Sequence, residues 1–117
     1  MATIHIRDLK LRAIIGVNNW ERNIKQDVLI NISLDYNADR AVASDRLEDA
    51  LDYKSLKKRI VALVEGSDFH LLERLTAEIL DLTMADPLTR SATVRVDKCH
   101  ALHYADSVAV ELSRTKE

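Results

Sequence analysis

The residues of this chain that could do chemistry are concentrated between residues 97 and 106. This segment, DKCHALHYAD, holds two acids, a lysine, the only cysteine, two histidines and a tyrosine. The preceding residues alternate, with Ala92, Val94 and Val96 on one parity, as in a half-buried strand. Lys98 falls on the same apolar parity, so its ammonium must pair, reach solvent or lie in a site that uses it. By composition alone, a solvated hairpin loop is the simpler interpretation.

Two residues of this segment, His100 and His103, have the H-x-x-H spacing that some metal sites use. Such sites generally need further ligands at suitable geometry, and we therefore predict no metal. Cys99 is expected to be a small, part-buried residue.

Length and charge narrow the classes of protein to which the chain can belong. Its 117 residues, 47% hydrophobic and 31% charged, are those of one globular domain over residues 1–117. With 17 basic and 19 acidic side chains and no basic run longer than KKR at 57–59, a nucleic-acid partner is not expected. A single cysteine, an N-terminus without signal-peptide character and no bilayer-spanning stretch predict a cytoplasmic protein with no membrane partner.

Two strands are predicted at the start of the chain. Apolar residues alternate over 3–15, but their parity changes once, which predicts a β-bulge at Arg7-Asp8. Gly16 ends this strand, and a polar loop over 17–26 leads to a second, strongly alternating strand over 28–36.

The rest of the chain predicts two helices and then two more strands. Apolar residues recur at helical spacing in both helices and alternate in both strands. The expected elements are a short helical turn over 39–44, a helix from the N-cap Asp52 to Glu65, a helix from Leu72 to Asp86 stopped by Pro87, and strands over 92–97 and 107–112.

The predicted order is strand, strand, helix, helix, strand, strand, which belongs to the α+β class. Two helices can cover one face of a four-stranded antiparallel sheet, but the edge strands then stay open. The first two strands are long for so small a domain. Because closing several such sheets edge to edge into one barrel would cover these edges, we predict a homo-oligomer. The alternative is a monomer whose edge strands are protected by acidic and other charged residues.

Five short motifs, by their order and spacing, resemble a known family. They are Gly16-Val17 and Trp20-Glu21 after the first strand, Leu51-Asp52-Tyr53 and Leu71-Leu72-Glu73-Arg74 at the starts of the helices, and Asp97-Lys98 at the end of the third strand. Over essentially the whole chain, this pattern is similar to the dihydroneopterin aldolase family, which has the tunnelling fold. Aldolases usually have a proline after the lysine. The CHALHYADSV that follows the lysine here is similar instead to the epimerase branch of the family.

The resemblance implies a pterin substrate and neither a metal nor an organic cofactor. It implies a ring of four subunits whose sheets form one barrel, often with two rings stacked as an octamer, and active sites between neighbouring subunits. The epimerase branch implies inversion of C2′ of 7,8-dihydroneopterin triphosphate, giving dihydromonapterin triphosphate, through retro-aldol and aldol steps. Two alternatives stay open: an aldolase that releases 6-hydroxymethyl-7,8-dihydropterin and glycolaldehyde, and a non-catalytic pterin-binding or assembly module on the same scaffold.

The resemblance assigns roles to an acid and a lysine. Glu73 matches the family's pterin anchor, a carboxylate that accepts two hydrogen bonds from the ring, and backbone groups of Leu71 and Leu72 would complete these contacts. Lys98 matches the acid/base residue. Without the resemblance, Glu73 is an acid placed favourably at a helix N-terminus, and Lys98 is a strand-end lysine that reaches water.

Two further residues carry over in the same way. Tyr53 matches a tyrosine that positions water or assists protonation. Glu21 matches a loop carboxylate near the substrate's side chain, where it would orient Lys98 from another subunit. Their ordinary interpretations are a surface tyrosine at a helix start and a plain loop acid. Trp20, next to Glu21, is expected to be a packing anchor.

Recognition of the triphosphate is the least specified part of the expected site. A triphosphate needs several cations or a nest of backbone N–H groups. With only two glycines, the chain has no glycine-rich phosphate loop. One of the two histidines is expected near the hydroxyl or phosphate groups of the substrate. The candidates for the phosphates are Arg22, Lys25, Arg74, Arg95, His100 and His103.

Overall fold

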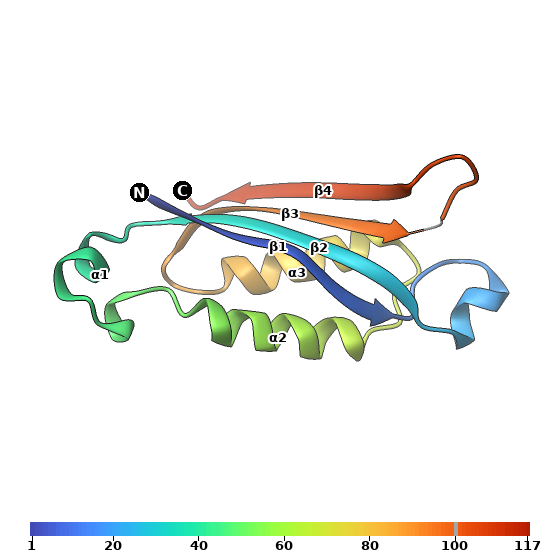
Figure 1. Cartoon of the computed structure of the whole chain (residues 1–117), viewed down its shortest axis with the longest axis horizontal. Coiled ribbons are helices and arrows are strands. Elements are labelled where there is room, and N and C mark those ends of the chain that lie inside the picture. The colour runs from blue at the N-terminus through green and yellow to red at the C-terminus, as the bar shows by residue number, and fades with distance from the viewer. Residues whose placement is uncertain (100) are drawn as a thin grey trace.

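The computed structural model describes residues 1–99 and 101–117, and it has the predicted order of main elements (Figure 1). Its four strands form one antiparallel sheet in the order β1-β2-β3-β4. Short helical segments precede β2 and α2 in addition to the two main helices. The elements are β1 (Ala2–Ala13), a 3-10 helix (Asn19–Asn23), β2 (Gln26–Tyr36), α1 (Asp39–Ser44), a 3-10 helix (Leu47–Asp49), α2 (Tyr53–Glu65), α3 (Leu72–Met84), β3 (Thr89–Cys99) and β4 (Ser107–Thr115).

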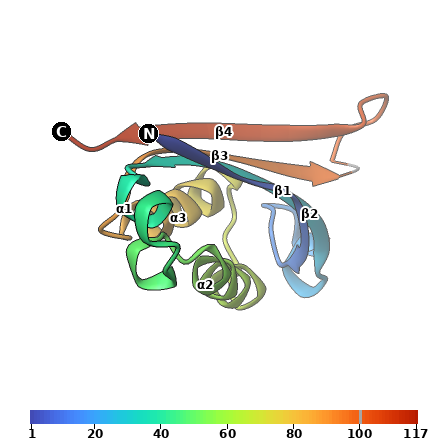
Figure 2. The same cartoon turned by 60° about the vertical axis from the view of Figure 1, so that its left-hand side comes forward.

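The helices cover one face of the sheet, as the alternation of apolar residues predicts (Figure 2). Helix α3 packs on β3 and β4, and α2 packs on β1. The core lies between these layers and is built from the inward side chains of β2, β3, α2 and α3. Its largest fully buried members include Ile30, Leu34, Leu56, Ile60, Leu75 and Ile79. The opposite face of the sheet carries polar side chains such as Asn31, Ser33 and Thr93.

The predicted β-bulge is confirmed in β1. Ile6 pairs with Ile32 and Leu9 pairs with Ile30, so two residues of β1 oppose one residue of β2. Asp8 takes a positive φ of 52° at this point, and its backbone N–H donates to Asn31 Oδ1 over 2.9 Å. The extra residue re-aims the following side chains and keeps the apolar residues on both sides of the bulge facing the helices.

Several boundaries differ from the predicted ones: β2, β3 and β4 are longer than predicted, whereas β1 and α3 end earlier. β1 ends at Ala13 rather than at residue 15, because Gln26 Nε2 donates to Ile15 O over 2.8 Å and a side chain replaces the next ladder bond. Helix α3 ends at Met84, two residues before its predicted end. The N-cap of α2 is the predicted one, since Asp52 accepts a hydrogen bond from Ser55 N over 3.1 Å.

The two edges of the sheet are β1 and β4, each of which has one partner strand within the chain. The described residues contain no helix with the length and apolar character needed to cross a membrane. A single chain does not test the predicted oligomer, which stays a prediction.

The division of the sheet into a core face and an open face predicts a difference between two adjacent residues. Ile30 is fully buried against the helices, whereas Leu29 lies on the opposite face and is half-buried. We expect Ile30→Ala to lower the free energy of unfolding by about 2–5 kcal/mol, because the helices cannot close the cavity completely. Leu29→Ala should cost clearly less. Urea denaturation at one fixed protein concentration measures both, and equal losses would contradict the assignment of faces.

Candidate active site

An ion pair between Lys98 and Glu21 lies at the end of β3. Lys98 keeps the apolar parity of the strand and therefore points to the helix-covered face, where its side chain is only 14% exposed. The loop between β1 and β2 lies at the same end of the sheet (Figure 1). There Lys98 Nζ donates to Oε2 of Glu21, whose side chain is 3% exposed. The predicted pairing is therefore present, but both partners belong to one chain and not to two subunits, because this loop folds back over the end of β3.

Glu21 is held by more than the lysine. Gln26 Nε2 donates to the same oxygen, Oε2, over 2.9 Å, and the side chain and backbone N–H of Asn18 donate to Oε1 over 2.9 and 3.2 Å. Burial alone would raise the pKa of this carboxyl, but the bonds from Lys98, Gln26 and Asn18 outweigh it and lower the pKa to about 2. Glu21 is therefore ionised at neutral pH and fixes the position of the ammonium.

Gly16 makes room for this carboxylate. Its φ is +131°, and a Cβ added there would lie 2.2 Å from Glu21 Cδ, so no other residue fits without displacing the acid. Arg22 then links the loop to the segment before α3. Its guanidinium donates to Gly16 O over 2.8 Å, to Phe69 O over 3.1 Å and to Asp68 O. These bonds fix the start of α3 at the same end of the molecule as the ion pair.

The residues predicted to hold a pterin ring lie at this start of α3. Leu71 is the exposed N-cap and supplies no capping side chain, whereas the side chain of Leu72 is buried in the core. Only the backbone of Leu72 can therefore reach a ligand, in line with the prediction. Glu73 is exposed, and its neighbour Arg74 pairs instead with Glu78. An open pocket of about 430 Å³ adjoins this turn and is lined by residues 68–71 and Arg74.

Tyr53 does not lie at the end of the sheet where the ion pair is found. It is 52% exposed at the first turn of α2 and lines a hollow together with Ile6. In the sheet, Ile6 is aligned with Ile32, which is aligned with Val94. Lys98 is four residues farther along β3, or about 13 Å at the rise of a strand. Within one chain, Tyr53 therefore lies beside the middle of the sheet and not beside Lys98 at the end of β3.

The remaining predicted residues lie in or near the loops at this end. His103 is exposed, with its ring centroid 6.4 Å from that of Tyr104, and His100 lies outside the described residues. Cys99 is half-buried, as predicted. Trp20 is 63% exposed, so its prediction as a packing anchor is wrong for the single chain: its short helix projects beyond the end of the core (Figure 1). Within residues 1–99 and 101–117, no group of His, Cys, Asp and Glu is arranged to hold a metal.

Sequence reasoning missed the residues that support the ion pair. Asn18 and Glu21 form a capping box, and this N-x-x-E spacing is a recognisable signal. Gln26 has the same parity as the inward-facing Val28 and Ile30. This parity is a second signal, because it places a polar side chain on the helix-covered face of the sheet. Only the need for a residue without a Cβ at Gly16 has no signal in the local sequence.

Asp97 supports the strand end from the other face of the sheet. Its carboxylate accepts bonds from Arg95 Nε over 2.9 Å and from Ser107 Oγ over 2.8 Å. The Arg95 bond, with that of Ser107, lowers the pKa of this part-buried carboxyl. Ser107 begins β4, so the acid ties the two strands together where the loop leaves the sheet.

A family model and two curated relatives match nearly the whole chain. A family model described as dihydroneopterin aldolase (FolB) matches residues 4–113. The chain is 49% identical over 113 residues to the dihydroneopterin triphosphate 2′-epimerase of Pseudomonas aeruginosa. The alignment covers 97% of this chain and 92% of that protein. The chain is 44% identical over 112 residues to the protein of the same name from Escherichia coli K12, with 96% and 93% covered.

The fold is similar to that of a solved aldolase. The crystal structure of Escherichia coli dihydroneopterin aldolase in complex with neopterin superposes with a TM-score of 0.92 and covers 97% of this chain and 99% of that one. The sequence identity to this aldolase is 30%, which is lower than the identity to either epimerase.

The lowered pKa of Glu21 predicts that the free energy of unfolding decreases in acid. Because the folded pKa is about 2 against a usual 4.5, the ionised carboxylate stabilises the fold above about pH 4.5, and this is lost as the pH falls toward 2. At about 1.4 kcal/mol per pKa unit, the contribution at neutral pH is roughly 3 kcal/mol. We expect Glu21→Gln to be less stable than wild type at pH 7, and the difference to shrink between pH 5 and pH 2 in urea denaturation.

Subtracting the free energy of unfolding of Glu21→Gln from that of wild type cancels the contributions of the other acids. Asp97 is present in both proteins, so its own lowered pKa cancels in the difference. The exposed Glu65 at the end of α2 provides the matched control, and Glu65→Gln should change the free energy of unfolding little at any pH. A difference between wild type and Glu21→Gln that does not vary with pH would contradict the assignment.

Proposed function

The chain belongs to the dihydroneopterin aldolase family, and on this premise we propose that it is an epimerase that inverts C2′ of 7,8-dihydroneopterin triphosphate. One observation carries the choice of reaction: the identity is 49% and 44% to two epimerases of the family but 30% to the aldolase of Escherichia coli. The product would be 7,8-dihydromonapterin triphosphate. This chemistry requires no cofactor, because the substrate itself accepts the electron pair.

The substrate contains its own electron acceptor. A dihydropterin has an imine between N5 and C6 that is conjugated to its ring. When a base removes the proton of the 2′-hydroxyl, the C1′–C2′ bond breaks, the 2′-carbon becomes an aldehyde, and the electron pair moves into the imine to give an enamine. Rotation of the aldehyde and re-formation of the same bond invert C2′, and the oxygen regains its proton. An aldolase differs only in that C1′ is protonated and the aldehyde leaves.

We assign the proton transfers to Lys98. Its Nζ is nearly enclosed and is fixed by Glu21, which stays ionised at neutral pH. Such a group can exchange a proton with a bound substrate directly or through one water. Glu21 acts as a positioning residue, because its own oxygens are occupied by Lys98, Gln26 and Asn18.

The pterin ring is assigned to the start of α3. Glu73 is exposed there and, with its two oxygens, can accept a planar pair of hydrogen bonds from the 2-amino group and N3 of the ring. The backbone N–H groups of Leu71 and Leu72 have no capping side chain and are available to the ring, whereas the two carbonyls already accept bonds from Arg74, Leu75 and Thr76. The open pocket before this turn is of a size suited to a small ligand.

We propose that the complete site forms between two copies of the chain. In one copy Tyr53 lies beside Ile6, and the position of Ile6 along the sheet is about 13 Å from that of Lys98, so we infer that the tyrosine that acts on a substrate bound at Lys98 comes from a neighbour. The open edges β1 and β4 are available to join neighbouring sheets into the predicted ring. The single cysteine is suited to the cytoplasm, which is the compartment we propose.

The proposed reaction is tested by the products it forms. Incubation with dihydroneopterin triphosphate, oxidation and chromatography should give monapterin triphosphate with little hydroxymethylpterin. We expect Lys98→Ala to slow this conversion by about 10²–10⁴-fold, the range for loss of an acid/base group. The same variant should still bind the pterin, whereas Glu73→Ala should lose binding of the ring.

Two other results would support the alternatives, an aldolase or a non-catalytic binding module. Rapid release of hydroxymethylpterin from unphosphorylated dihydroneopterin would make the protein an aldolase, the function that the fold match and the presence of Tyr53 also fit. Pterin binding without turnover, unchanged in Lys98→Ala, would indicate a binding module.

A site shared between copies predicts that two inactive variants complement each other. Tyr53→Ala and Lys98→Ala should each be nearly inactive alone. In a co-assembled one-to-one mixture, about one quarter of the sites in a head-to-tail ring would combine an intact Lys98 with an intact Tyr53. We therefore expect activity to recover toward this fraction when the variants are co-expressed. A mixture no more active than the sum of the separate variants would contradict the shared site.

A further inference from the structure

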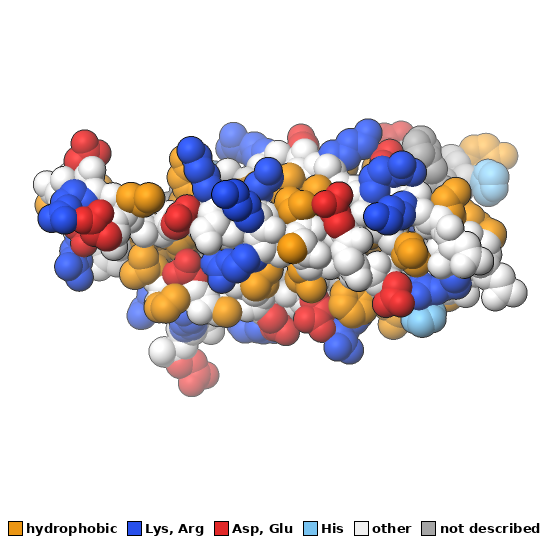
Figure 3. Space-filling view, turned by 90° about the horizontal axis from the view of Figure 1, so that it is seen from below, with side chains coloured by type: hydrophobic (Ala, Val, Ile, Leu, Met, Phe, Trp, Pro, Cys, Tyr) orange, Lys and Arg blue, Asp and Glu red, His pale blue; other side chains and the backbone are white. Residues whose placement is uncertain are grey.

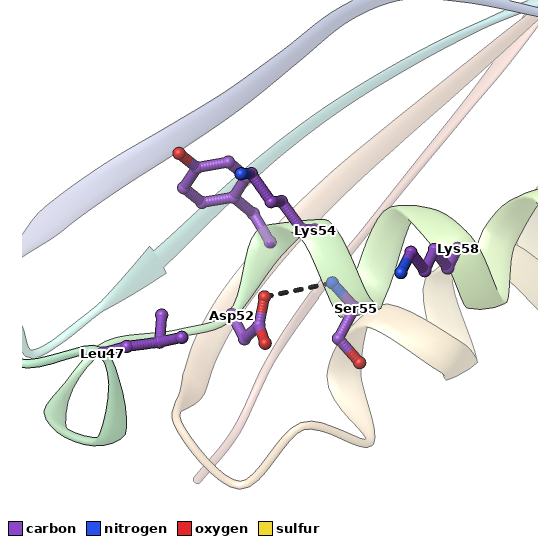
Figure 4. A pocket seen from close by; sticks show the side chains of 6 residues that line it. Leu47, Asp52, Lys54, Ser55 and Lys58 are labelled. Carbon is purple, nitrogen blue, oxygen red and sulfur yellow. Dashed lines mark hydrogen bonds between the residues drawn. The ribbon is translucent and has the colours of Figure 1, made fainter.

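The first two turns of α2 form a hollow surface with a high density of lysines. One pocket of about 450 Å³ is lined by Leu47, Asp52, Tyr53, Lys54, Ser55 and Lys58 (Figure 4). A second hollow of about 410 Å³ shares three of these residues and adds Ile6 and Lys57. The helical spacing of the three lysines brings their ammonium groups onto neighbouring positions of the helix. The helix-covered side of the molecule shows basic side chains gathered over this half of α2 (Figure 3).

These lysines are not neutralised within the chain. In the part of the chain that the structure describes, the ion pairs involve other cations, and none involves Lys54, Lys57 or Lys58. The one carboxylate that lines the pocket is Asp52, which already accepts the bond from Ser55 N as the N-cap of α2. Like charges at this spacing repel one another and weaken a helix, so the arrangement has a cost that a bound anion would remove.

The arginines expected from the sequence to bind phosphates are engaged elsewhere. Arg22 donates to three backbone carbonyls of its own chain. Arg74 pairs with Glu78 over 2.9 Å and lies over the ring of Phe69. Arg95 pairs with Asp97 on the open face of the sheet, away from Lys98. The lysines of α2 are therefore the better-placed free cations next to a residue of the proposed site.

We propose that Lys54 and Lys58 bind the triphosphate of the substrate, with Lys57 beside them. The proposal rests on the proposed function, in which Tyr53 of one copy faces the reacting side chain of a pterin held by Glu73 and Lys98 of the next. The triphosphate is attached to the far end of that side chain. Lys54 follows Tyr53 directly, Lys58 is one helical turn farther, and both lysines line the same two hollows as the tyrosine. Neither ammonium group forms an ion pair with the described residues. Both would therefore bind the phosphates as point charges.

The test separates binding of the phosphates from binding of the ring. In the double variant Lys54→Ala/Lys58→Ala we expect KM for dihydroneopterin triphosphate to rise about tenfold or more, since tenfold in affinity corresponds to the loss of about one charge-assisted contact. The inhibition constant of unphosphorylated dihydroneopterin should stay within about twofold of the wild-type value, because the ring contacts are untouched. The matched control is Arg59→Ala, which removes an exposed cation from the same helix on the side that faces Glu78 and Asp81.

The results separate failure of this proposal from failure of the proposed function. If wild type epimerises the triphosphate but the double variant has an unchanged KM, or loses affinity equally for both pterins, the lysine site is wrong. If wild type turns over neither pterin, the proposed function is wrong, and calorimetry with inorganic tripolyphosphate decides the site. Binding by wild type and Arg59→Ala that is lost in the double variant would support the site. Equal binding by all three proteins, or none by wild type, would overturn it.

Discussion

The buried ion pair between Glu21 and Lys98 is the interaction on which the rest of this end of the molecule depends. Enclosing two charges costs solvation free energy, which their mutual attraction offsets only when the other hydrogen-bonding positions are also filled. Here Gln26 and Asn18 fill those of the carboxylate. Gly16 leaves the space that the carboxylate occupies. The loop between β1 and β2 is thereby held in one conformation against the end of the sheet.

The same requirement accounts for the connection between the loop and α3. Arg22 collects three backbone carbonyls from the loop and from the segment before the helix, which have no strand or helix to satisfy them. The helix start and the ion pair consequently form one polar region at one end of the sheet. Asp97 stabilises the same strand end from the opposite face, through Arg95 and Ser107.

The other residues of the proposed site lie on the first turns of α2, and part of the length of β3 separates them from the ion pair. Within one chain, Tyr53 and the lysines of α2 do not lie beside Lys98. A neighbouring copy supplies both from one short stretch of helix in the arrangement we propose. The reaction and the recognition of the phosphates would then depend on assembly, and the open edges β1 and β4 provide the surfaces for it.

Much of this protein was determined by its sequence alone, because period and parity are local properties. The alternation of apolar residues predicted four strands, and the single change of parity located the bulge at Asp8. The parity of Lys98 marked a lysine on the buried face, and the order of the motifs indicated the family. These features need no knowledge of which distant residues meet.

Only the tertiary structure decided the contacts between segments that are far apart in the chain. Glu21 and Lys98 are separated by 77 residues, and the sequence does not say that they pair within one chain. The exposure of Trp20 and the engagement of Arg22 by backbone carbonyls depend likewise on where the loop and helices pack. The same is true of the α2 lysines, which form no ion pair with any residue that the structure describes. The physical reason is that a side chain's charge and type are fixed by the sequence, whereas its partners and its access to water are fixed by the folded surroundings.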